Sequence, residues 1–206
     1  MNRVALLAFG VAVVACSALL WGTEVLLPGT GVGAVVLVAI TVIAIIVVQP
    51  GWNVRPRHLD RRLLLLFGLV VASAAAAAAF LSVVPIPHPY HGAQFHLIGA
   101  LPTIAAITGI EELLFRQAMY RWLESRTDSP RTAVIATATA FGWMHLGLLL
   151  FGEPAHMAFH TLQSLYMVWI GLLLGEIRRL TASWPMSWLG HFGYNVIVLA
   201  AFDASA

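Results

Sequence analysis

The chain has 206 residues, of which 60% are apolar and only 10% are charged. Soluble proteins average about 25% charged residues, so this composition excludes a soluble globular protein. It indicates an integral membrane protein with one domain over residues 1–206. The formal charge of +2 gives no sign of nucleic-acid binding, and the single cysteine, Cys16, excludes an internal disulfide.

Seven apolar segments are long enough to cross a bilayer, which takes about 17–25 residues in a helix. They fall at 4–21, 32–48, 63–84, 97–122, 132–151, 159–177 and 185–202. The sequence therefore predicts an all-α fold, a polytopic membrane helix bundle with about seven transmembrane helices.

The basic residues predict the orientation of this bundle. All of them are arginines, and all except Arg116 lie before the first segment or beside alternate connections. These are Arg3, Arg55, Arg57, Arg61, Arg62, Arg121, Arg126, Arg131, Arg178 and Arg179. Because basic loops stay in the cytosol, we expect a cytoplasmic N-terminus, an outer C-terminus and a multi-pass protein of the cell's inner (plasma) membrane.

The fourth segment carries three ionisable residues, Glu111, Glu112 and Arg116. A charged side chain at the bilayer centre costs about 2.5–3.5 kcal/mol, so such residues usually mark a functional site. Glu112 and Arg116 are four apart and share a helix face, whereas Glu111 is rotated by about 100°. We interpret Glu112–Arg116 as a structural pair and Glu111 as the chemically available carboxylate. The alternative is a packing network that only stabilises the bundle.

Two later segments add polar groups. The fifth contains Phe141 and His145, and the seventh contains His191 and Asn195, each pair four residues apart and on one face. At about 1.5 Å per residue, these polar groups and Glu111 lie about 10–20 Å from the cytoplasmic helix ends. Three helices are therefore expected to bring them together at similar depth.

Such a set supports hydrolysis. Glu111 and His145 could hold a water molecule and take its proton as it attacks a carbonyl carbon. His191 and Asn195 could donate hydrogen bonds to the resulting oxyanion. Because no serine or cysteine lies suitably near these clusters, the sequence does not favour a nucleophilic mechanism.

Three short motifs carry a family resemblance. Glu-Glu-x-x-x-Arg at 111–116, Phe-x-x-x-His at 141–145 and His-x-x-x-Asn at 191–195 follow one another in membrane segments. In this order they resemble the motifs of the CAAX prenyl protease and bacteriocin-processing (CPBP, or Abi) family. The resemblance covers residues 97–202, the expected catalytic part. Residues 1–96, the variable N-terminal helices, match only in being apolar.

This resemblance implies a glutamic-type intramembrane endopeptidase whose site opens toward the cytosol. Carried over to this chain, it assigns water activation to Glu111 and His145 and oxyanion stabilisation to His191 and Asn195. The supporting residues are Glu112, Arg116 and Phe141. The expected partners are the lipid bilayer and a peptide or protein substrate, either lipid-modified or membrane-embedded.

Alternatives remain for the cofactor and for the function. A glutamate and two histidines can ligate zinc, but the resemblance implies a metal-free mechanism, so we expect no cofactor. A proton-coupled small transporter could use the same residues as a relay, although the chain shows no internal repeat. A non-catalytic family member, acting as a scaffold or immunity protein, is the second alternative.

Overall fold

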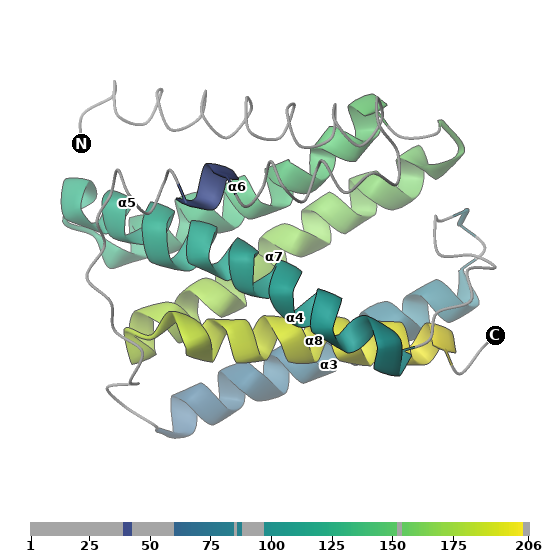
Figure 1. Ribbon diagram of the computed structural model, residues 1–206, viewed down its shortest axis with the longest axis horizontal. Coiled ribbons are helices and arrows are strands. Elements are labelled where there is room, and N and C mark those ends of the chain that lie inside the picture. The colour runs from purple at the N-terminus through teal and green to yellow at the C-terminus, as the bar shows by residue number, and fades with distance from the viewer. Residues whose placement is uncertain (1–38, 43–59, 85, 88–96, 152–153, 204–206) are drawn as a thin grey trace.

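The computed structural model describes residues 39–42, 60–84, 86–87, 97–151 and 154–203 (Figure 1). Helices make up nearly all of these ranges, and they contain no strand. The all-α class is thus confirmed for the described part of the chain. The first two predicted segments lie outside it, apart from a helical stretch at 39–42. The number of transmembrane helices and the orientation stay predictions.

The five later segments correspond to helices with slightly extended ends. In chain order the helical elements of the described ranges from residue 60 onward are α3 (Arg61–Val83), α4 (Leu97–Glu112), η1 (Leu113–Met119), α5 (Tyr120–Thr127), α6 (Pro130–Phe151), η2 (Pro154–His156), α7 (Met157–Thr181) and α8 (Trp184–Asp203). The fourth predicted segment is one continuous rod of α4, η1 and α5, which runs across the bundle in Figure 1. Its middle part, η1, is a π-helix.

Local sequence explains several helix ends. The side chain of Asp60 accepts a hydrogen bond from the Leu63 amide at 3.0 Å and caps the start of α3. Asp128 adopts the left-handed conformation that ends α5, and Pro130 opens α6 with a φ angle already suited to a helix. Ala182, also left-handed, ends α7 just before α8 begins.

Three described stretches are long and apolar enough to cross a membrane. They are Arg61–Val83, Ile98–Thr127 and Pro154–Thr181. Large apolar side chains point outward along them, such as Val83 at 79% exposure and Ile98 at 84%, while Arg116 is completely buried. Lipid suits apolar groups outside, and a dry interior requires its charges to be paired. This distribution is that of a membrane protein.

The helices pack through small residues. α6 lies along α7, and α8 packs against α3, α4 and α7. Between α6 and α7 the backbones are close: a Cβ atom added at Gly171 would lie 2.9 Å from Cα of Ala138, and one at Gly142 would lie 2.7 Å from the Ser164 carbonyl oxygen. Such close approach gives the van der Waals contact that holds membrane helices together.

Gly142→Ala tests this close packing. The new methyl group would meet backbone, and we expect a loss of about 1–3 kcal/mol in the free energy of unfolding. Gly68→Ala is the matched control, because a Cβ atom there has nothing within 4 Å and alanine favours the helix by about 0.5–1 kcal/mol. Thermal unfolding in detergent measures both, and equal effects of the two changes would contradict the packing described.

Candidate active site

The two adjacent glutamates stand where the rod changes its helical type. α4 ends at Glu112, and the π-helix η1 begins at Leu113. In a π-helix each amide pairs with the carbonyl five residues earlier, and such turns are rare and often occur at functional sites. The ladder shows this spacing at its end, where the Tyr120 amide donates to the Phe115 carbonyl. Glu111 and Glu112 therefore lie at the N-terminal end of a helical segment whose turns are wider than those of an α-helix.

Glu112 and Arg116 form the pair that their spacing predicts. Arg116 Nη1 lies 3.4 Å from Glu112 Oε1, and both side chains are fully buried. The guanidinium also reaches α7, where Nη2 donates to the Gly171 carbonyl at 3.3 Å. On α8, His191 Nδ1 donates to the same Glu112 oxygen at 3.0 Å. This carboxylate thus joins the rod to α8, and its arginine partner joins the rod to α7.

Glu111 also lies close to His191, and the sequence did not predict that both glutamates would reach the same ring. Its Oε2 atom lies 3.7 Å from His191 Nε2, and its side chain is 13% exposed, against 0% for Glu112. The two carboxylates approach opposite nitrogens of one imidazole, so they share a partner although they are rotated from each other on the helix. They remain different in access, since Glu111 is the less buried of the two.

Phe141 is the centre of an aromatic cluster that holds both histidines. Its ring makes edge contacts with the rings of His145 and His191, at centroid distances of 5.0 and 5.4 Å. The Arg116 guanidinium lies over the same ring, 4.6 Å from its centroid. The motif residue Phe141 therefore links the second motif to the other two.

The hydrogen bond of His145 defines its tautomer. Its Nδ1 atom lies 2.9 Å from the Phe141 carbonyl oxygen. A carbonyl only accepts, so Nδ1 carries the hydrogen, and in the neutral ring Nε2 is left as an acceptor. Nε2 is thus the nitrogen that can take a proton.

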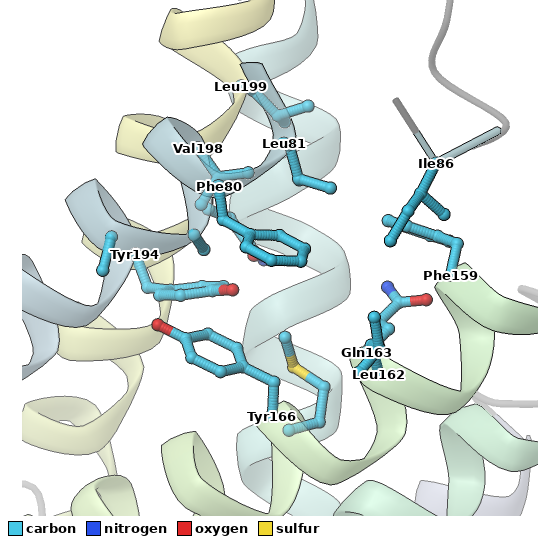
Figure 2. Close-up of a pocket in the computed structure, with 14 residues that line it drawn as sticks. Phe80, Leu81, Ile86, Phe159, Leu162, Gln163, Tyr166, Tyr194, Val198 and Leu199 are labelled. Carbon is cyan, nitrogen blue, oxygen red and sulfur yellow. The ribbon is translucent and has the colours of Figure 1, made fainter. Parts of the chain in front are cut away.

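Asn195 connects this cluster to a cavity. It lies one turn after His191 on α8 and lines a cavity of about 590 Å³ between α3, α7 and α8. Figure 2 shows Tyr194 and Gln163 on opposite walls of this cavity. The Tyr166 hydroxyl, which also lines it, donates to the Ser73 carbonyl of α3. The cavity walls are mainly apolar, and their polar groups belong to Gln163, Tyr166, Tyr194 and Asn195.

The structure thus brings most of the predicted residues together. His191 is contacted by Glu111, Glu112 and Phe141. Arg116 contacts Glu112 and Phe141. Among the described residues, Glu111 and His145 share no direct bond and are linked through His191 and Phe141. The water-holding pair therefore stays a prediction, as does the oxyanion role of Asn195.

Arg178 is the site neighbour that sequence reasoning missed. The alternation of arginines placed it in a cytoplasmic connection, but α7 continues to Thr181 and Arg178 is only 2% exposed. It donates from Nε to the Arg116 carbonyl at 2.9 Å and from Nη2 to Gln117 Oε1 at 3.4 Å. The available signal was its place directly after an apolar segment, which does not separate a loop from the last helical turn.

The glutamates and histidines of the site are also residue types that ligate zinc. In the described part of the chain, no group of three or more histidine, cysteine, aspartate or glutamate side chains is arranged to hold a metal ion. The metal-free mechanism stays a prediction.

A family model described as Type II CAAX prenyl endopeptidase Rce1-like matches residues 92–197, which is about half of the chain and contains all three motifs. No curated protein and no solved structure matches the chain. The match agrees with the resemblance seen in the motifs and implies a protease embedded in the membrane. The chain therefore belongs to the Rce1-like family of type II CAAX prenyl endopeptidases.

Proposed function

We propose that this protein is an intramembrane endopeptidase that hydrolyses a peptide bond by direct attack of water. The observation that carries the proposal is the contact of His191 with both motif glutamates, at 3.0 Å to Glu112 and 3.7 Å to Glu111. Residues of the first and third family motifs thus meet in the interior, and Phe141 of the second motif contacts the same imidazole. A packing network needs only neutralised charges, whereas here the second carboxylate is partly accessible.

Glu111 and His145 are the proposed water-activating groups. Glu112 is fully buried and its Oε1 atom is already engaged by Arg116 and His191, so it is the less accessible of the two carboxylates. Glu111 retains exposure, and His145 Nε2 is free to accept once Nδ1 donates to the Phe141 carbonyl. A carboxylate and an imidazole that both accept hydrogen bonds suit the removal of a proton from water. The bound peptide would bring these two groups into reach of one water molecule.

His191 and Asn195 are the proposed oxyanion donors. Nδ1 of His191 already donates to Glu112, so only Nε2 can face a substrate. Donation from Nε2 requires a doubly protonated ring, whose charge would lie between two carboxylates. The Asn195 amide, one turn further along α8, lines the cavity and could provide a second donor.

The reaction then follows in two steps. Glu111 or His145 takes a proton from water, the hydroxide attacks the carbonyl carbon, and the negative oxygen accepts hydrogen bonds from His191 and Asn195. The carbon–nitrogen bond breaks as the proton is passed to the leaving amine, which yields a carboxylic acid and a free amine. The apolar cavity beside Asn195 suits the apolar part of a membrane-embedded or lipid-modified peptide.

Glu111→Gln tests the proposed base. It keeps size and hydrogen bonding but removes the proton acceptor, so cleavage should fall by at least ~100-fold, and His145→Ala should do the same. The measurement compares peptides released by membranes that contain wild-type or variant protein at equal amounts. A proton-coupled carrier predicts instead that proton flux is lost in Glu111→Gln while no peptide differs between the membranes. Unchanged cleavage by Glu111→Gln would remove the proposed mechanism.

Glu112→Gln tests the proposed division between the two carboxylates. It leaves the buried Arg116 guanidinium without its countercharge, and removal of one partner of a buried pair costs about 3–5 kcal/mol. We expect a clearly lower thermal unfolding temperature in detergent, with residual cleavage in the fraction that remains folded. Glu111→Gln is the matched variant and should unfold nearly as the wild type does. The reverse pattern, a stable Glu112→Gln protein without activity, would exchange the two roles.

A further inference from the structure

At the C-terminal end of the π-helix η1, the backbone hydrogen-bond pattern changes in a way that leaves one carbonyl group without an amide partner. Its last bond pairs the Tyr120 amide with the Phe115 carbonyl, five residues apart, and α5 begins at Tyr120. Where a ladder returns from five-residue to four-residue spacing, one carbonyl is passed over and loses its amide partner. The carbonyl that follows Phe115 is that of Arg116. A carbonyl without a partner in a dry interior is unfavourable, so a donor has to come from elsewhere.

Arg178 supplies that donor. Its Nε atom lies 2.9 Å from the Arg116 carbonyl oxygen. Its Nη2 atom donates to Gln117 Oε1 at 3.4 Å, and its guanidinium lies over the Tyr120 ring, 5.3 Å from the centroid. One buried side chain of α7 therefore contacts three positions around the π-to-α transition, 116, 117 and 120. The fork of the guanidinium makes this possible, since it offers donors in several directions.

The contact is reciprocal, which fixes the rod on α7. Arg116 of the rod donates to the Gly171 carbonyl of α7, and Arg178 of α7 donates to the Arg116 carbonyl of the rod. Gly171 and Arg178 are seven residues apart, about two turns, and so lie on one face of α7. Two arginine–carbonyl contacts along this face prevent the rod from rotating about its own axis.

Rotation of the rod would move the site. A π-helical segment contains one residue more than an α-helical segment with the same number of turns. If η1 became α-helical, Glu111 and Glu112 would therefore rotate relative to α5 by about 100°. His191 on α8 would then lose one or both carboxylates. We infer that Arg178 is a positioning residue for the two motif glutamates, which it serves by stabilising the π-helical form of η1. It acts through its hydrogen bond to the Arg116 carbonyl.

Arg178→Met tests this inference against Arg179→Met. Both changes remove one positive charge from neighbouring positions of α7, but the Arg179 side chain is 30% exposed and pairs with Glu176 at 2.7 Å. The first measurement is amide hydrogen exchange of the purified full chain in detergent. Arg178→Met should speed exchange in residues 113–119 and leave α6 and α8 as in the wild type, while Arg179→Met should change neither. Uniformly faster exchange in all helices, or none in 113–119, would overturn the inference.

The kinetic readout rests on the proposed function. With a peptide that the wild type cleaves, Arg178→Met should lower kcat by about 100-fold, as misplacement of reacting groups by about 1 Å can, and leave KM nearly unchanged. Arg178→Lys, which can still donate to the Arg116 carbonyl, should restore most of kcat and of the exchange protection. If Arg178→Met does not fold, the lysine variant decides: wild-type exchange with wild-type kcat supports the inference, and loss of both overturns it. A wild-type protein that cleaves nothing would count against the proposed function, while the exchange result would still decide the role of Arg178.

Discussion

The buried ion pair of Glu112 and Arg116 is the constraint on which the rest of the structure depends. Two charges in an apolar interior are tolerated only when they are paired with each other and held by further hydrogen bonds. Glu112 finds His191 on α8, and Arg116 finds the Gly171 carbonyl on α7. The pair therefore determines which faces of α7 and α8 turn toward the rod. It also brings the third motif next to the first without any direct requirement from catalysis.

Around this pair the interior separates fixed groups from available ones. Glu112 and Arg116 are enclosed, whereas Glu111 is less buried and Asn195 faces a cavity. Phe141 touches both imidazoles and lies under the Arg116 guanidinium, so one apolar ring holds three polar groups at defined distances. Preorganisation of this kind is what hydrolysis of an unreactive amide requires, because charge that develops in the transition state must meet donors already in place.

Much of this arrangement could be predicted from the sequence, because it follows from helical periodicity. Four-residue spacing placed Glu112 with Arg116 and His191 with Asn195, and depth along each helix predicted that His191 would approach the glutamates. The approach of both carboxylates to one ring could not be predicted in this way. It depends on how α8 crosses the end of α4, and the π-helix that follows depends on contacts from α7. An α-helical wheel assumes 3.6 residues per turn throughout.

Arg178 is a second residue whose place could not be predicted from the sequence. Counted as a basic residue after an apolar segment, it indicated a cytoplasmic loop, and the positive-inside rule does not separate loop arginines from arginines in the last helical turn. Its partner is a backbone carbonyl, and such partners leave no trace in side-chain spacing. The first two predicted helices lie outside the described ranges apart from residues 39–42, and the orientation of the chain stays a prediction.

The most direct test of the central claim is an experimental structure of the Glu111→Gln protein with an uncleaved peptide bound. We expect the scissile carbonyl oxygen to lie within hydrogen-bond distance of His191 Nε2 and the Asn195 amide. We also expect one water molecule held between residue 111 and His145 on the face of the carbonyl opposite the leaving amine. A peptide bound elsewhere in the bundle, or a carbonyl that faces away from His191, would contradict the account.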